Sequence, residues 1–339
     1  MESSEQRLPV SVLTGFLGSG KTTLLARLLR HPGMAETAVI VNEFGEVGLD
    51  HALIAKSDEN TILLNSGCLC CTVRGDLVDT LRDLFLKRVR LEVPEFRRVV
   101  IETTGLADPA PILHTLMSDP LVAARYRLDG VITTVDAVNG AAALDRQMES
   151  VKQAAVADRV LLTKTDLASE SVIADLTQRL RRLNPGAPIE PVVLGAIEPW
   201  RLLNAGLYDP ESKTTDVQRW LNEEAYAAQT DAEHQRHDHA QHGTDGPHHH
   251  EGEEHSHAGL DVNRHDARIS SFCLYLDEPV EWDRLSYWLD LLAMHRGEDL
   301  LRVKGLINVK GMQQPVAIHG VQHLFHPPAA IDAWPDDDR

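Results

Sequence analysis

The chain of 339 residues lacks the features that mark membrane proteins and secreted proteins. It has no run of about eighteen apolar residues, so no membrane-spanning helix and no membrane partner are expected. The first residues, MESSEQRLPV, contain no apolar core of a signal peptide. Only four cysteines occur, and three fall within residues 68–71, which does not suit a secreted disulfide framework. We therefore expect a cytoplasmic protein.

Basic residues are also scarce. Lys and Arg number 33 against 51 Asp and Glu, which gives a formal net charge of −18. Such a surface repels polyanions, so neither nucleic acid nor an anionic membrane is expected as a partner. The length nevertheless allows a large core and two domains.

One segment near the N-terminus carries a nucleotide-binding pattern. Residues 10–14 read as a short buried strand, residues 15–22 fit G-x-x-x-x-G-K-[ST], and an apolar-faced helix continues to residue 29. Strand, glycine loop and helix in this order predict a P-loop, whose backbone N–H groups surround a phosphate. Lys21 then supplies a positive charge to the β- and γ-phosphates, and Thr22 offers a hydroxyl to Mg²⁺.

Short apolar segments follow at regular spacing, separated by helical patterns such as the one at 77–89. This alternation predicts an α/β P-loop NTPase fold over residues 1–205, with a mainly parallel sheet covered by helices. The loops at the carboxyl ends of the strands should form the site. The further strands are expected at 37–41, 61–64, 98–101, 131–135, 160–162 and 191–194.

The character of the sequence changes after residue 205. Within a linker at 206–267, residues 228–259 contain no Leu, Ile, Val, Met or aromatic residue, and nine histidines lie between His234 and His257. Such a tract cannot bury a core, and we expect it to be disordered. Two interpretations stay open: weak collection of Zn²⁺, Ni²⁺ or Co²⁺ by imidazoles and carboxylates, or a solvated acidic linker.

A small α+β C-terminal domain is expected at 268–326, followed by a polar tail at 327–339. Its pattern predicts a helix at 282–293 and strands at 269–276, 300–303, 307–309 and 316–319. Cys273 alternates with core positions of the first strand and is interpreted as packing.

Two further motifs concern the nucleotide. The strand at 98–101 ends in Glu102, the Walker B position, and Gly105 keeps the D-x-x-G spacing that presents an N–H to the γ-phosphate. Residues 163–166, TKTD, resemble the N-K-x-D guanine signature with Thr in place of Asn. The Asp166 carboxylate could accept from guanine N1–H and the 2-amino group together, whereas adenine would leave it poorly paired, so GTP is favoured. The alternative is an ordinary helix-capping aspartate.

Three thiols in a C-x-C-C pattern, at Cys68, Cys70 and Cys71, predict a soft-metal site. Thiolates suit Zn²⁺ or Cu(I), and three sulfurs leave a tetrahedral shell one ligand short. Glu46 and Glu43, in the preceding NEFGE segment, are the candidates for the missing ligand. A buried cysteine cluster is the other interpretation. A disulfide is not expected, because a bond between the neighbours Cys70 and Cys71 would be strained.

Together these motifs resemble the CobW-type metal-chaperone GTPases, relatives of the urease- and hydrogenase-maturation GTPases. GFLGSGKTT, NEFGE, GCLCC, ETTG and TKTD occur in the family's order, with a histidine-rich linker and a small C-terminal domain. The resemblance implies that Lys164 and Asp166 bind guanine, that the cysteine triplet binds a transition metal, and that residues 15–23 bind phosphate and Mg²⁺. In that last segment the expected binding residues are Gly15, Gly18, Ser19, Gly20, Lys21, Thr22 and Thr23.

We therefore expect a GTPase that binds Zn²⁺, or alternatively Co²⁺ or Ni²⁺, and transfers it to an apo-metalloprotein client. Lys21, Thr22 with Mg²⁺, and Glu102 are its expected catalytic residues. No residue stands out as the one that positions water, so hydrolysis should be slow without a partner. A nucleotide-dependent homo-oligomer stays open.

Three other functions stay open. They are a metal buffer or sensor that binds nucleotide only as a regulator, a cobalt or nickel insertion GTPase, and an ATP-dependent kinase with a zinc knuckle. His114 follows the Asp108–Pro111 segment and could reach a metal, but we interpret it as a core or surface residue.

Overall fold

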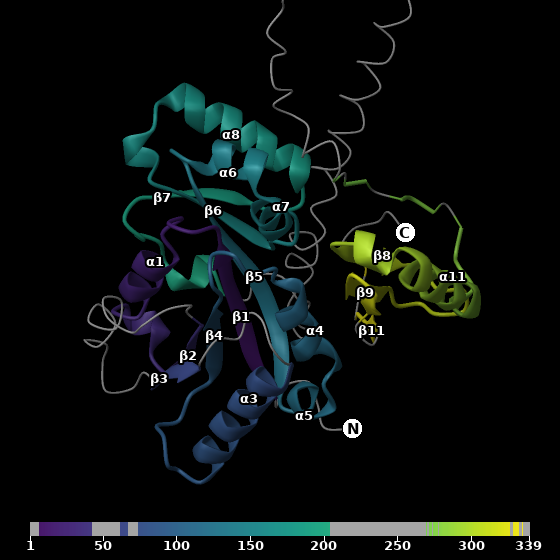
Figure 1. The fold of residues 1–339 in the computed structure, drawn as a ribbon. Coiled ribbons are helices and arrows are strands. Elements are labelled where there is room, and N and C mark those ends of the chain that lie inside the picture. The colour runs from purple at the N-terminus through teal and green to yellow at the C-terminus, as the bar shows by residue number, and fades with distance from the viewer. Residues whose placement is uncertain are drawn as a thin grey trace, which may run out of the picture.

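The computed structural model describes residues 7–42, 62–66, 74–203, 269, 271–272, 274–276, 278–325, 328–331 and 334. The described chain forms a seven-stranded sheet with helices on both faces and a smaller four-stranded sheet carrying one long helix (Figure 1). No helix among these residues is long and apolar enough to cross a membrane. The α/β prediction with a separate α+β C-terminal unit is confirmed.

The large sheet is parallel throughout, and its strand order is β3-β2-β4-β1-β5-β6-β7. The order places β1, which leads into the P-loop, at the centre, so that loops from its neighbours can converge on it. The strands are β1 (Leu8–Gly15), β2 (Thr37–Asn42), β3 (Ile62–Ser66), β4 (Arg98–Glu102), β5 (Tyr126–Asp136), β6 (Arg159–Thr163) and β7 (Ile189–Val192).

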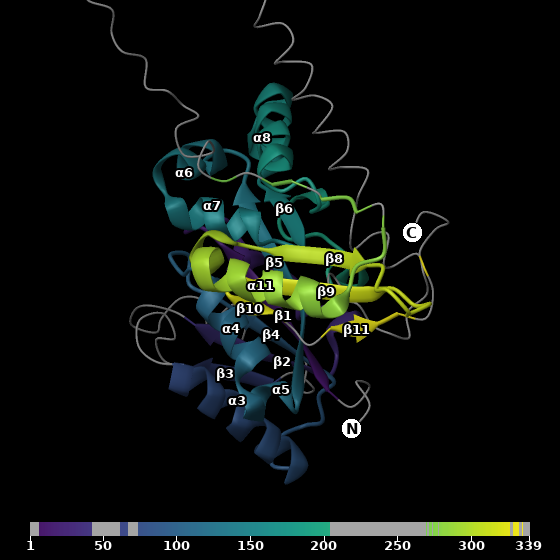
Figure 2. The same ribbon diagram turned by 90° about the vertical axis from the view of Figure 1, so that its right-hand side faces the viewer.

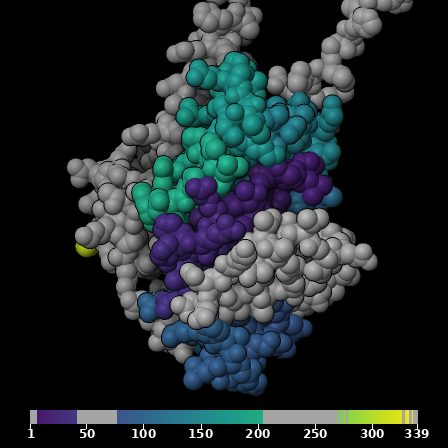
Figure 3. All heavy atoms as spheres, turned by 90° about the vertical axis from the view of Figure 1, so that its left-hand side faces the viewer, coloured from purple at the N-terminus to yellow at the C-terminus, as the bar shows by residue number. Residues whose placement is uncertain are grey.

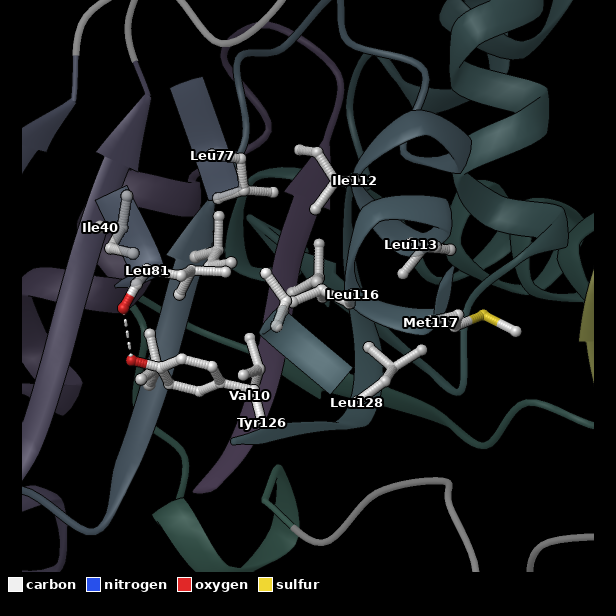
Figure 4. Close-up of a cluster of buried hydrophobic side chains, with 14 of the residues drawn as sticks. Val10, Ile40, Leu77, Leu81, Ile112, Leu113, Leu116, Met117, Tyr126 and Leu128 are labelled. Carbon is white, nitrogen blue, oxygen red and sulfur yellow. Dashed lines mark hydrogen bonds between the residues drawn. The ribbon is translucent and has the colours of Figure 1, made fainter. Parts of the chain in front are cut away.

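All seven predicted strands exist, with shifted ends. The last one ends at Val192 and not at 194, because Leu194 adopts a left-handed φ of 49° and Gly195 one of 73°, which turns the chain. The fifth starts at Tyr126, five residues before the predicted strand. Tyr126 is 1% exposed, and its hydroxyl donates to the Leu81 carbonyl at 2.9 Å (Figure 4).

Alternate residues of the strands face opposite helical layers. Val10 and Ile40 belong to a core under α3 and α4 (Figure 4), whereas Leu13 and Val39 pack under α1. A third core joins β5 and β6 to α7 and α8. The helices are α1 (Lys21–Leu28), α3 (Arg74–Val89), α4 (Ala110–Ser118), α5 (Pro120–Ala123), α6 (Gly140–Arg146), α7 (Met148–Ala155) and α8 (Glu170–Leu183), with short 3₁₀ turns η2 (Pro32–Met34), η3 (Thr165–Leu167) and η4 (Pro199–Arg201).

The small sheet is antiparallel and has β9 at its centre, paired with β8 on one side and with β10 and β11 on the other. Leu285 and Leu289 of α11 pack on Val316 and Ile318 of β9. The elements are α11 (Trp282–Arg296), η6 (Gly297–Asp299), β8 (Val303–Ile307), β9 (Val316–Val321), β10 (Leu324–Phe325) and β11 (Ala329–Ala330). The predicted helix and the predicted strand at 316–319 are confirmed.

Two predictions in this region are wrong. The described residues of 269–276 form no strand, and Phe272 and Leu274 are exposed; alternation defines a possible face, but a strand also needs a paired neighbour. The strands predicted at 300–303 and 307–309 are instead the single strand β8, running through Gly305. A Cβ there would lie 3.3 Å from Ile318 Cγ1, so glycine fits where β8 passes close to β9.

The small sheet packs against the helical layer of the large sheet, in front of α4 and α7 (Figure 2). Val321 and Leu324 join the core of α3 and α4. His114 of α4 is buried, and its Nε2 lies 3.1 Å from the Val321 carbonyl, while its ring meets that of His323 edge to face. The interpretation of His114 as a core residue is confirmed.

Candidate nucleotide site

The P-loop joins the carboxyl end of β1 to the start of α1 at the middle of the sheet (Figure 1). Gly15 has a φ of 141°, and a Cβ on it would collide with the Thr134 hydroxyl and carbonyl and with Ser19 Oγ. Only glycine fits this position. The first described segment, residues 7–42, which contains the loop, is coloured purple in the space-filling view of Figure 3 and reaches the surface there.

Neighbouring strands fix the shape of the loop. Ser19 Oγ and Thr134 Oγ1 of β5 are 2.6 Å apart, and Thr163 Oγ1 of β6 donates to the Ser19 carbonyl at 2.7 Å. Thr163 is the residue that replaces Asn in the guanine signature. Its hydroxyl links the end of β6 to the P-loop through this hydrogen bond. Lys21 is 8% exposed, and its Nζ donates to the carbonyls of Gly15 and Phe16 at 2.8 and 3.2 Å.

Thr22 and Glu102 come together as predicted for a Mg²⁺ position. Thr22 Oγ1 donates to Glu102 Oε1 at 2.9 Å, and Glu102 is 3% exposed. A hydroxyl and a buried carboxylate at a strand end are oxygen ligands of the kind Mg²⁺ prefers, so the residues fit this ion. When bound, Mg²⁺ would neutralise charge on the nucleotide phosphates. Thr23, by contrast, is exposed on α1.

Gly105 lies against the P-loop. A Cβ on Gly105 would come 2.6 Å from the Leu17 amide nitrogen, which leaves room for no side chain. Its carbonyl accepts from Gln153 Nε2 at 3.2 Å. The structure therefore brings the D-x-x-G loop beside the phosphate-binding loop, as its spacing predicted.

Lys164 is held by a residue that the sequence analysis missed. Its Nζ donates to Asp136 Oδ2 at 2.7 Å, and Asp136, at the end of β5, also accepts from the amides of Val138 and Asn139 and from Asn139 Nδ2. Burial alone would raise the pKa of Asp136, but hydrogen bonds from Lys164 and Asn139 outweigh it and lower that pKa. An acid that ends an apolar strand, as Glu102 does, was the available signal.

Asp166 lies in η3, two residues after Lys164, and is exposed. Lys164 itself adopts a left-handed φ of 56°, which turns the chain between strand β6 and η3. Asp166 is thus at the carboxyl edge of the sheet, with its carboxylate accessible.

A pocket of about 310 Å³ lies beside the P-loop. It is bordered by Phe16–Ser19 on one side and by α6 on the other, with Lys164 and Asp136 in its wall. Lys21, Thr22 and Glu102 are outside this lining, so the pocket lies on the β5 side of the loop, away from the expected Mg²⁺ position.

The predicted metal residues Glu43, Glu46, Cys68, Cys70 and Cys71 lie outside the described residues, as do the histidine tract and Cys273. Among the residues that the structure describes, no group of three His, Cys, Asp or Glu side chains could hold a metal. The described strand ends are informative all the same. Asn42 at the end of β2 pairs with Ser66 at the end of β3, so the backbones leading to Glu43 and to Cys68 start side by side.

Comparison with known proteins agrees with this arrangement. Residues 9–191 match the nucleotide-binding domain described as CobW/HypB/UreG, and residues 269–339 match the cobalamin synthesis protein cobW C-terminal domain. The chain belongs to the CobW/HypB/UreG family. The family match covers the P-loop, Glu102, Gly105 and the Lys164–Asp166 segment in one domain.

Three named members of this family illustrate the similarity. The zinc chaperone YjiA of Escherichia coli is 34% identical over 318 residues, covering 94% of this chain and 87% of that one. The zinc-regulated GTPase metalloprotein activator 1 of Schizosaccharomyces pombe is 32% identical over 204 residues, 58% and 48% of the two chains. The zinc chaperone CobW of Sinorhizobium is 31% identical over 197 residues, 50% and 54%.

Solved structures give the same result. The Zn(II)-bound YjiA GTPase of E. coli superposes with a TM-score of 0.65 at 29% identity, covering 98% of this chain and 92% of that one. A Zn(II)-bound triple mutant of YjiA, with a glutamate and two cysteines changed to alanine, gives 0.66 over 98% and 91%.

Proposed function

We propose that the protein is a GTP-hydrolysing metallochaperone that takes Zn²⁺ as cargo at Cys68, Cys70 and Cys71 and delivers it to an apo-metalloprotein. The observation that carries the proposal is the pairing of β2 with β3, which continues to Asn42 and Ser66 at the carboxyl ends of the two strands. In the sheet, β4 alone lies between β2 and β1, the strand that leads into the P-loop. From the pairing of β2 with β3 we expect the NEFGE segment, which begins at Asn42, and the cysteine segment, which follows Ser66, to leave the sheet side by side at the carboxyl ends of its strands.

The hydrolase part of the proposal is supported by the described site. Lys21, whose Nζ lies against the loop at the Gly15 carbonyl, and the loop amides would stabilise charge on the transferring phosphoryl group, and Thr22 with Glu102 would hold Mg²⁺. Asp166 supplies the acceptor for guanine. The sequence motifs assign no residue to orienting water, so we expect slow turnover without a partner. The relatives named GTPase, including YjiA, support the same activity.

The metal part rests on ligand chemistry. Three thiolates suit Zn²⁺ and leave one position for Glu46 or Glu43, which an apo-client could displace during transfer. The relatives named zinc chaperone favour Zn²⁺ over Co²⁺ and Ni²⁺. The YjiA mutant without one glutamate and two cysteines is still described as Zn(II)-bound, so zinc content alone does not locate a site. The test must therefore compare affinities between variants.

The decisive experiment measures Zn²⁺ affinity in two nucleotide states. If the γ-phosphate orders the Gly105 and NEFGE segments, Zn²⁺ should bind more tightly with a nonhydrolysable GTP analogue than with GDP, by about 5–150-fold. Cys71→Ser should weaken Zn²⁺ binding and abolish this difference while leaving GDP affinity unchanged. Cys273→Ser is the matched control and should change neither quantity. Equal Zn²⁺ affinity in both states of the wild type would contradict a GTP-gated carrier.

The other functions predict different results. A metal buffer or sensor would bind Zn²⁺ without nucleotide dependence, and a kinase with a zinc knuckle would prefer ATP. A cobalt or nickel insertion GTPase would show the nucleotide effect with Co²⁺ or Ni²⁺ and not with Zn²⁺. Running the same titrations with these ions and with ATP separates the four.

A further inference from the structure

Helix α7 lies between the Gly105 loop and the small sheet of the C-terminal region. Starting from the proposed function, we infer that Gln153 of α7 is a positioning residue for the Gly105 loop. We further infer that α7 couples docking of the small sheet to the discrimination between GTP and GDP. Neither role is visible in the P-loop or guanine motifs.

Gln153 holds the loop from inside the protein. Its side chain is 1% exposed, and Nε2 donates to the carbonyls of Gly105 at 3.2 Å and Ala107 at 2.9 Å. Two carbonyls on one side fix which end of the amide faces the loop. Thr133 Oγ1 of β5 donates to the Gln153 carbonyl at 2.8 Å, which ties this turn of α7 to the sheet.

The other end of the same amide is unsatisfied. Gln153 Oε1 is buried and has no hydrogen-bond partner among the described residues. A buried acceptor without a donor is costly, and such costs persist at places where the structure changes. A loop arrangement that brings a backbone N–H to Oε1 would satisfy it, and this arrangement is the proposed second position of the Gly105 loop.

A second contact ties the far end of the loop to α7. Lys152 Nζ donates to Asp108 Oδ2 at 2.8 Å, and Asp108 Oδ1 accepts from the Ala110 amide at the start of α4. The adjacent residues Lys152 and Gln153 therefore hold the loop at both ends.

Two cations at the start of β8 in the small sheet, Arg302 and Lys304, contact the segment just after α7. Arg302 Nη1 donates to the Val156 carbonyl at 3.2 Å, and Arg302 Nη2 donates to both carboxylate oxygens of Asp158 at 2.7 and 2.9 Å. Lys304 Nζ lies 2.8 Å from the same carboxylate, whose side chain is fully buried. The sheet contact at Val156 lies three positions after the loop contact at Gln153.

Because the loop contacts lie on α7 and the contacts with Arg302 and Lys304 lie on the segment that directly follows it, a shift of the Gly105 loop should change the position of α7 against the small sheet. Ligands that bias either contact then bias the other to the same degree. Docking of the small sheet and binding of the γ-phosphate should therefore each shift the population of Gly105 loop arrangements. A change at the small sheet should then alter the ratio of GTP to GDP affinity.

The test is the ratio of affinities for a nonhydrolysable GTP analogue and GDP. Gln153→Met keeps the volume but removes the donor, and should reduce this ratio about fivefold or more without changing GDP affinity. Tyr126→Phe is the matched control, because it removes a buried side-chain donor to a backbone carbonyl far from the loop; it should lower stability and leave the ratio unchanged. An unchanged ratio in folded Gln153→Met overturns the inference.

A second variant tests the link to the small sheet. Arg302→Met should change the GTP-to-GDP ratio from outside the nucleotide site, and in the double variant with Gln153→Met the two effects should be non-additive. Arg296→Met, at an exposed ion pair with Asp299, is the control and should have no effect. Strict additivity, or no effect of Arg302→Met, contradicts the coupling.

A measurement on the wild type needs no variant. Amide hydrogen exchange in residues 148–156 should differ between the GTP-analogue and GDP complexes, and equal exchange overturns the coupling. A wild-type protein that binds both nucleotides equally would overturn the proposed GTPase gating as well. Normal discrimination in the wild type with no effect in Gln153→Met overturns this inference alone.

Discussion

Two aspartates near Lys164 have different surroundings and, we infer, different roles. Asp136 is 7% exposed, and its carboxylate accepts hydrogen bonds from Lys164 and Asn139 within the protein. Asp166 is exposed and lies on the other side of Lys164 along the chain. The first fixes the lysine, and the second stays available to a nucleotide base.

This difference makes the choice of base a prediction about Asp166. Asp166→Asn replaces one carboxylate oxygen with an amide NH₂ donor, which would face the 2-amino donor of guanine, so GTP should bind about 100-fold more weakly. Xanthosine triphosphate keeps N1–H but carries a C2 carbonyl acceptor in place of the 2-amino group, so it should bind better than GTP. Fluorescent-nucleotide titration gives both affinities.

Asp175→Asn on α8 is the matched control, since it changes the same charge on an exposed helix outside the site. It should leave both affinities unchanged. Unaltered GTP binding by Asp166→Asn would show that guanine is recognised elsewhere.

At the level of elements, the carboxyl ends and the amino ends of the strands in the large sheet carry different groups. The carboxyl ends of β1, β4, β5 and β6 carry the P-loop, Glu102, Asp136 and the Lys164 segment. At the amino end of β6 lies Asp158. Its carboxylate accepts a hydrogen bond from the Val131 amide and forms ion pairs with Arg302 and Lys304. Strand β6 therefore runs from the interdomain ion cluster to the base-recognition segment.

The Asp158 cluster should contribute strongly to stability. Burial alone would raise the pKa of Asp158, but Arg302 and Lys304 outweigh it and hold that pKa below its usual value. Asp158→Asn removes the fully buried carboxylate that pairs with the partly buried Arg302 and Lys304, so urea unfolding at pH 7 should show a loss of about 3–5 kcal/mol. Asp299→Asn, at an exposed pair, should cost about 1 kcal/mol or less.

The sign of the pH dependence follows from the lowered pKa. Because Asp158 has a lower pKa in the folded than in the unfolded protein, its contribution is complete above the unfolded value of about 3.9. It is lost as the pH falls below that value toward the folded pKa. The stability difference between wild type and Asp158→Asn should therefore shrink below about pH 4. A difference that stays constant down to pH 3 would contradict this assignment.

For the whole molecule, the strongest prediction concerns the histidine tract. Residues 231–258 contain nine histidines and no large apolar residue, so we expect them to add nothing to a hydrophobic core. Deleting 231–258 should leave the unfolding midpoint, GTP turnover and one tight Zn²⁺ site unchanged and remove weaker sites. Calorimetric Zn²⁺ titration of both proteins counts the sites.

Replacing all nine histidines with serine at constant length is the control for the effect of shortening the linker. It should remove the same weak sites as the deletion. Loss of the tight site in either variant would show that histidines, and not the cysteine triplet, form it.

The sequence by itself determined the local features, namely which segments become buried strands and the P-loop with Gly15 and Lys21. It also predicts the chemistry of Glu102, Asp166 and the cysteines. These follow from side-chain period, glycine conformation and the charge on single groups, all of which are local. It failed at 269–276 and at Gly305 because strand pairing depends on a neighbour that local pattern does not contain.

Only the tertiary structure decided which distant residues act together. Asp136 with Lys164, Gln153 with Gly105, and Asp158 with Arg302 are separated by 28, 48 and 144 residues. No periodicity links such positions, because the strand order and the docking of the small sheet bring them together after local structure has formed. The sequence therefore predicts the chemistry of the site, and the fold decides which residues position it.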